Sequence, residues 1–146
     1  MIAKVAYKED HHFNFEIRGM HGEIDVTSVD PKGPNPKELV LAALCGCTGT
    51  DVVDLLKKFG VIYESLELTA QASLTDQHPK HFKSIEVSYY LRGVGIDIVQ
   101  VVEAAKRSMH QYSGTAAMLA RACPITYKVH INDEIVASDS ASFASY

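Results

Sequence analysis

Apolar and polar residues alternate along the first 27 residues in three short stretches. A period of two is typical of β-strands, and the polar segments 9–12 and 19–22 between the stretches predict turns. We therefore predict a three-stranded antiparallel meander over residues 1–27. The apolar positions that carry this period are Ala3, Val5, Tyr7, Phe13, Phe15, Ile17, Ile24 and Val26.

A long apolar stretch follows a loop rich in Pro and Gly, DPKGPNP. Asn35 is a favourable N-cap, and Pro36 suits the first helical position. Glu38 falls at the third position, from which its carboxylate can reach back to the cap. With Gly60 as the terminator, the pattern predicts a central helix over about residues 35–59.

The first half of this helix has no polar face. Residues 39–44 are apolar on every side, so we expect them to be buried all round. A domain of this size has few ways to enclose a helix. The small residues Ala42, Gly46 and Thr50 recur every fourth position and would let a second backbone approach closely. We infer a two-fold homodimer in which a second copy of the chain covers the helix.

The second half of the chain shows both periods again. Alternation over about residues 63–92 predicts a hairpin, and alternation over about 124–132 predicts a last strand. Between them, helical spacing over about 96–122 predicts helices that are interrupted at Gly114. The small polar tail, 138–146, is expected to be flexible. This order of elements predicts an α+β fold in which antiparallel strands are wrapped around the long central helix.

Length and composition limit the class of protein. A chain of 146 residues corresponds to a single domain over residues 1–146. The formal net charge of -4 gives no basic surface, so we expect no nucleic-acid partner. No N-terminal leader pattern is visible, and no apolar run reaches the roughly 18–20 residues that a membrane helix needs. Three cysteines are too few for a disulfide scaffold, so we expect a cytoplasmic protein with reduced or redox-cycling thiols and no membrane partner.

Two of the three cysteines, Cys45 and Cys47, lie in the predicted central helix. Successive helical residues are about 100° apart, so these thiols face nearly opposite sides and cannot form a disulfide together. Cys45 follows Leu44 on the apolar surface, which favours a packing role. For Cys47 the pattern fits a packing role and a reactive role equally well. Because Asp51, one turn later, would oppose a Cys47 thiolate, a reactive Cys47 needs a cation from another segment.

Seven histidines are the remaining candidates for a metal site. They do not recur at metal-ligand spacing, and no carboxylate or cysteine joins them in a recognisable ligand set. We therefore predict no metal and no other bound cofactor. The histidines are expected on the surface or in polar loops: His11, His12, His21, His78, His81, His110 and His130.

The segment GPNPKELVLAALCGCTGTDVV resembles the central-helix signature of the OsmC/Ohr family, the osmotically inducible protein C and organic hydroperoxide resistance proteins. The order of strands and helices resembles that family over nearly the whole chain. The resemblance implies an intertwined homodimer with thiol-based active sites at the subunit interface. Family peroxidases reduce organic hydroperoxides: a thiolate becomes a sulfenic acid, which a second cysteine resolves and an external dithiol reduces.

Carried over residue by residue, the resemblance places the peroxidatic cysteine at Cys47. It implies that Arg18 stabilises the thiolate and the developing charge on the leaving oxygen, and that Glu38 orients Arg18. In the best-known members the carboxylate stands one position earlier, where this chain has Lys37. Glu38 also fits a capping box, and Arg18 also fits a solvated turn.

The second cysteine is the largest departure from the family pattern. The matching position holds Ser113, which cannot form a disulfide, and Cys123 lies ten residues further on. Three interpretations stay open: Cys123 resolves the oxidised Cys47, an external thiol does so, or the protein is not a peroxidase. The alternative function is a non-enzymatic member that binds a small apolar ligand or senses redox state.

Overall fold

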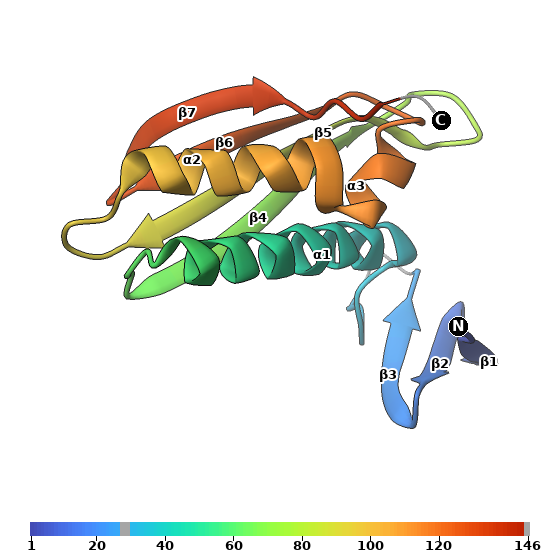
Figure 1. Cartoon of the computed structure of the whole chain (residues 1–146). Coiled ribbons are helices and arrows are strands. Elements are labelled where there is room, and N and C mark those ends of the chain that lie inside the picture. Colours follow the sequence, from blue (N-terminus) through green and yellow to red (C-terminus); the bar gives the residue numbers. More distant parts are fainter. Residues whose placement is uncertain (27–29, 145–146) are drawn as a thin grey trace. The chain divides into compact units, whose positions relative to one another are not determined.

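A computed structural model describes residues 1–26 and 30–144 (Figure 1). The chain divides into two compact units, Met1–Ala42 and Ala43–Tyr146, where the sequence analysis expects one domain. Each unit has its own hydrogen-bonded sheet, which is the physical reason for the division. Residue 27 of the predicted meander and residues 145–146 of the predicted tail lie outside the described residues.

The first unit contains the predicted meander. Its strands β1 (Lys4–Glu9), β2 (His12–Ile17) and β3 (Met20–Asp25) pair antiparallel in the order β1-β2-β3. The two-residue turns lie at Asp10–His11 and Arg18–Gly19, all with positive φ as tight hairpins require. Every side chain of β1 is exposed in the single chain, including the apolar Val5 and Tyr7.

The long helix α1 spans Pro36–Phe59 and confirms the predicted central helix. Asn35 Oδ1 accepts hydrogen bonds from the backbone N–H groups of Lys37 at 2.9 Å and Glu38 at 3.1 Å. The Glu38 carboxylate accepts the Asn35 N–H at 2.9 Å, which completes a capping box. Gly60, with a φ of 72°, ends the helix.

By length and composition alone, α1 is long and apolar enough to cross a membrane. The expectation that no apolar run reaches the length of a membrane helix is therefore not met by length and composition. One helix of this kind is weak evidence, because the core helix of a soluble protein meets the same criteria. In this structure Leu44 and Leu56 on α1 are fully buried by protein.

The second unit is built on a four-stranded sheet in the order β4-β5-β6-β7 (Figure 1). β4 (Ser65–Leu74) and β5 (Phe82–Arg92) form the predicted hairpin, and β6 (Ile125–Ile131) matches the predicted last strand. β6 lies parallel to β5, whereas the sequence analysis expects antiparallel strands throughout. Helices connect these two strands, and a helical crossover returns the chain to the end from which it started.

The C-terminal tail differs from the prediction. Residues Glu134–Ser140 form a further strand, β7, which pairs antiparallel with β6. The turn residues Asn132 and Asp133 have φ values of 49° and 70°, the conformation of a tight hairpin. The chain stays bonded beyond β7, since the Ala141 N–H donates to Ile125 O at 2.8 Å. The expectation of a flexible tail from residue 138 is therefore wrong for this part.

Three helical segments cross between β5 and β6: α2 (Ile98–Arg107), the π-helical turn η1 (Ser108–Tyr112) and α3 (Gly114–Leu119). They confirm the predicted helices, but the break lies at Ser113, which has an extended backbone, and Gly114 is the first residue of α3. α2 and the part of α1 in this unit lie over the same face of the sheet (Figure 1). Buried side chains fill the space between them, among them Leu44, Leu56, Val87, Tyr89, Val101, Met109, Tyr127 and Val129.

Candidate functional site

Cys47 lies near the middle of α1 with its side chain half-buried. The other helical cysteine, Cys45, has a thiol pKa that burial raises above its usual value. All three cysteines of the chain are free thiols. The different surroundings of Cys45 and Cys47 agree with the prediction that these two residues do not act as a pair.

The Cys47 sulfur meets the first turn of α3. Ser113, the N-cap of α3, is fully buried, and its hydroxyl oxygen accepts the Ala116 N–H at 3.2 Å. The same hydroxyl donates its hydrogen to Cys47 Sγ at 3.4 Å. Thr115 adds two further hydrogen bonds to Cys47, one from its backbone N–H and one from its side chain. The thiol is therefore held by three donors from one short segment.

These donors determine the acidity of Cys47. Burial, the largest single influence, raises the pKa of the thiol, but the hydrogen bonds from Ser113 and Thr115 together outweigh it. The negative charge of Asp51 acts against them. The net result is a Cys47 pKa below its ordinary value, so more of the thiol is ionised at neutral pH than in an ordinary cysteine.

Ser113→Ala is expected to raise the pKa of Cys47, because the thiolate loses a donor that stabilises it. The pH at which alkylation by iodoacetamide reaches half its limiting rate should then move upward. Ser113→Cys, the family arrangement, provides a second comparison. An unchanged alkylation midpoint in a folded Ser113→Ala protein would contradict the role of this hydroxyl.

A second polar cluster lies beside Cys47 on α1. Thr48 Oγ1 is hydrogen-bonded to the hydroxyl of Tyr89 on β5 and, at 2.6 Å, to Ser108 Oγ at the start of η1. Ser108 Oγ also donates to Asp51 Oδ2 at 2.9 Å. The side chains of Thr48, Ser108 and Tyr89 are fully buried, and burial raises the pKa of Asp51. We refer to these four residues, Thr48, Asp51, Tyr89 and Ser108, as the hydroxyl chain.

Arg18 and Glu38, the other residues predicted for the site, lie in the first unit, Met1–Ala42. Arg18 is exposed in the turn between β2 and β3 and has a φ of 54°. Glu38 has the capping-box geometry that the sequence analysis gives as its alternative role. Their contribution to the chemistry of Cys47 stays a prediction.

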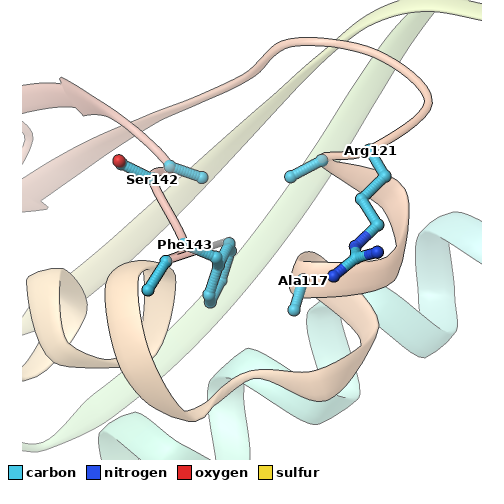
Figure 2. A pocket seen from close by; sticks show the side chains of 7 residues that line it. Ala117, Arg121, Ser142 and Phe143 are labelled. Carbon is cyan, nitrogen blue, oxygen red and sulfur yellow. The ribbon is translucent and has the colours of Figure 1, made fainter. Parts of the chain in front are cut away.

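No group of three or more His, Cys, Asp or Glu side chains in residues 1–26 and 30–144 is arranged to hold a metal ion. A cavity of about 460 Å³ opens between α3 and the segment that follows β7. Figure 2 shows Ala117 and Arg121 on one side of it and Ser142 and Phe143 on the other. Its walls combine alanine side chains and the ring of Phe143 with the Ser142 hydroxyl and the Arg121 guanidinium.

Comparison with known proteins identifies the family. The model of the family described as OsmC-like protein matches residues 29–128, more than half of the chain. The chain belongs to the OsmC-like family. Protein YhfA of Escherichia coli strain K12 is 28% identical over 131 residues, which cover 90% of this chain and 98% of YhfA.

Solved structures of OsmC-like proteins have the same fold. The OsmC-like protein of Mycoplasma pneumoniae is 12% identical, with a TM-score of 0.79 over 89% of this chain and 95% of that one. The organic hydroperoxide resistance protein OhrB of Bacillus subtilis is 17% identical, with a TM-score of 0.61 over 90% of this chain and 98% of that one. The predicted resemblance to the OsmC/Ohr family is confirmed.

Within this OsmC-like fold, Ser113 contacts the sulfur of Cys47, and Cys123 follows the opposite end of α3. The Cys123 N–H donates to Leu119 O at 3.1 Å, its side chain is buried, and burial raises the pKa of its thiol. A resolving role for Cys123 stays a prediction. From the sequence alone Ser113 is only the position of a missing cysteine, and Thr115 is not predicted at the site. The signal for both was the segment SGT before an apolar run, which is typical of an N-cap.

Proposed function

We propose that this OsmC-like protein is a thiol-dependent peroxidase that reduces organic hydroperoxides, with Cys47 as the nucleophile. The observation that carries the proposal is the set of hydrogen bonds from Ser113 and Thr115, which lower the pKa of Cys47. The thiolate is the form that attacks a peroxide oxygen. The structural likeness to organic hydroperoxide resistance proteins supports the same class of substrate.

In the proposed reaction the Cys47 thiolate attacks the distal oxygen of the hydroperoxide. A sulfur–oxygen bond forms, the oxygen–oxygen bond breaks, and the products are a Cys47 sulfenic acid and an alcohol. One sulfur of an external dithiol then displaces water from the sulfenic acid and forms a mixed disulfide with Cys47. The second sulfur of the dithiol attacks this mixed disulfide, which releases the reduced Cys47 thiol and leaves the dithiol as a disulfide. In this proposal no bound cofactor takes part.

The proposal assigns resolution to the external dithiol rather than to Cys123. Ser113 occupies the position next to the Cys47 sulfur, and its hydroxyl cannot form a disulfide. Cys123 is separated from Ser113 by the length of α3, and its side chain is only 6% exposed. Its raised pKa also disfavours the thiolate that a resolving cysteine needs.

The proposal includes a homodimer in the cytoplasm without nucleic-acid or membrane partners. Support for self-association comes from large apolar side chains that the single chain leaves exposed. Val5 is 53% exposed and Tyr7 67% exposed on β1, and Val53 is exposed on α1. Large apolar side chains that a single chain leaves exposed on a strand or a helix are typical of protein interfaces. Within the dimer, Arg18 and Glu38 keep the roles that the family resemblance implies.

The test is mass spectrometry of the reduced protein after mild treatment with cumene hydroperoxide, with dimedone present to trap sulfenic acid. We expect a dimedone adduct on Cys47 alone, and a mixed disulfide on Cys47 when a monothiol replaces dimedone. A Cys47–Cys123 disulfide would contradict external resolution while leaving the peroxidase proposal in place. An unmodified Cys47 would contradict the peroxidase proposal itself.

A second candidate function is the binding of a small apolar ligand by a non-enzymatic protein. The cavity beside α3 supports it, because about 460 Å³ lies within the usual size of a small-molecule pocket. Arg121 at its rim would suit an acidic group on such a ligand. An unmodified Cys47 in the oxidation experiment would favour this candidate over the peroxidase.

A further inference from the structure

The hydroxyl chain has one direction of hydrogen donation. Ser108 gives its only hydroxyl hydrogen to the Asp51 carboxylate at 2.9 Å. The bond between Thr48 and Ser108 must then use the Thr48 hydrogen, and the bond between Thr48 and Tyr89 must use the phenol hydrogen. All three hydroxyl groups therefore donate toward Asp51, which is the acceptor at the end of the chain.

Asp51 is fixed close to Cys47 although its charge opposes the thiolate. The two residues are one helical turn apart, which places their Cβ atoms about 5–6 Å from each other on one face of α1. The charge of Asp51 raises the pKa of the Cys47 thiol. A carboxylate that Ser108 holds at this position therefore does not serve to stabilise the thiolate.

The π-helical turn η1 connects Ser108, which binds Asp51, to Ser113, which binds Cys47. In an α-helix, residues five positions apart differ by about 140° in direction. Here the Ser113 N–H donates to Ser108 O at 2.9 Å, an i to i+5 bond that replaces the i to i+4 bond of an α-helix. As a result both hydroxyls face α1: Ser113 binds Cys47 and Ser108 binds Asp51. One segment thus positions both the sulfur and the carboxylate.

We propose that Asp51 is the general acid of the Cys47 site and protonates the oxygen that leaves when the peroxide bond breaks. This inference rests on the proposed peroxidase function. Ser108 occupies Oδ2 of Asp51, and within residues 1–26 and 30–144 the other oxygen, Oδ1, has no hydrogen-bond partner. Oδ1 is therefore the oxygen of Asp51 that can carry the proton for the leaving group.

The proton balance of the step closes within the site. Asp51 takes up the proton that the Cys47 thiol loses on ionisation. The thiolate attacks the distal oxygen, the sulfur loses two electrons, and the oxygen–oxygen bond breaks. The leaving alkoxide takes the proton from the Asp51 carboxyl group and departs as an alcohol. The net reaction converts one thiol and one hydroperoxide into one sulfenic acid and one alcohol.

The surroundings of Asp51 suit a carboxyl group that carries a proton. Burial and the charge of Asp54 raise its pKa, and the hydrogen bond from Ser108 partly offsets them. The ionisable groups that act on it are Cys47 and Asp54 on α1 and Tyr89 on β5. None of these is a cation, so nothing among them holds the carboxylate in its charged form.

The experiment compares two oxidants in the wild type and in Asp51→Asn, a variant whose amide oxygen can still accept the Ser108 hydrogen bond. Cumene hydroperoxide releases an alkoxide, which needs a proton, whereas peracetic acid releases acetate, which does not. The rate of Cys47 sulfenic acid formation is measured with each oxidant by rapid quench into dimedone. In Asp51→Asn we expect the rate with cumene hydroperoxide to fall roughly 100-fold and the rate with peracetic acid to stay within about threefold.

Asp76→Asn is the matched control, because Asp76 is an exposed carboxylate in the loop between β4 and β5, and both of its rates should stay near wild type. A parallel change of both rates in Asp51→Asn, or no change, overturns the inference and leaves the peroxidase proposal standing. A wild type that does not react with cumene hydroperoxide at all overturns both.

Discussion

Cys47→Ser is expected to reduce the consumption of cumene hydroperoxide in the presence of a dithiol by at least about 1,000-fold, to the rate of the protein-free mixture. A serine hydroxyl beside the same Ser113 and Thr115 donors would not ionise at neutral pH, and it cannot be oxidised to a sulfenic acid. The measurement is peroxide loss over time, with the protein reduced beforehand and the dithiol in excess.

Two matched cysteine variants serve as controls for this experiment. Cys45→Ala should keep wild-type activity, because the Cys45 thiol has a pKa raised by burial and points away from Cys47. Cys123→Ala should also keep it, since the external dithiol resolves the sulfenic acid. If Cys123→Ala forms one sulfenic acid per chain and then stops, Cys123 is the resolving residue after all.

The central helix could be predicted because its signals are local. Asn35, Glu38 and Gly60 act through neighbours within four residues, and the structure has the capping box and the positive φ that these residue types predict. The same holds for the alternating strands of the meander. Its turns were predicted at 9–12 and 19–22, whereas the structure has the shorter turns Asp10–His11 and Arg18–Gly19, so residues 20–22 belong to β3. The peroxidatic position of Cys47 came from the family signature, which is also a local pattern.

The remaining errors concern interactions between distant parts of the chain. The parallel pairing of β5 and β6 depends on where the crossover helices return, which no short pattern records. The strand β7 had a local signal, since Asn132 and Asp133 are typical residues of a tight turn, but the small polar sequence after it favoured a tail.

The environment of Cys47 is the clearest case of a long-range contact. The sequence analysis requires a cation from another segment for a reactive thiol. In the structure, neutral donors lower the pKa: the hydroxyl of Ser113, 66 positions away along the chain, and the N–H and hydroxyl of Thr115. The opposing effect of Asp51, which follows from helix geometry alone, was predicted correctly.

Thr48→Val is expected to lower the free energy of unfolding by about 1–3 kcal/mol, because it leaves a buried polar group without a partner. Valine has nearly the shape of threonine, so packing changes little. The phenol of Tyr89 is fully buried, and its hydrogen bond to Thr48 would be lost. The measurement is urea unfolding of the wild type and the variant at the same pH.

A double-mutant cycle with Tyr89→Phe separates the missing hydrogen bond from other effects of the substitution. In Tyr89→Phe the phenol is absent, so Thr48→Val on that background no longer leaves it unpaired and should cost less than it does in the wild type. Costs that add to within about 0.5 kcal/mol would show that the two side chains do not stabilise each other. A larger coupling would mean that Tyr89 and Thr48 stabilise each other and hold the end of the hydroxyl chain in place. Thr48 in turn binds Ser108, whose hydroxyl fixes Asp51 beside Cys47.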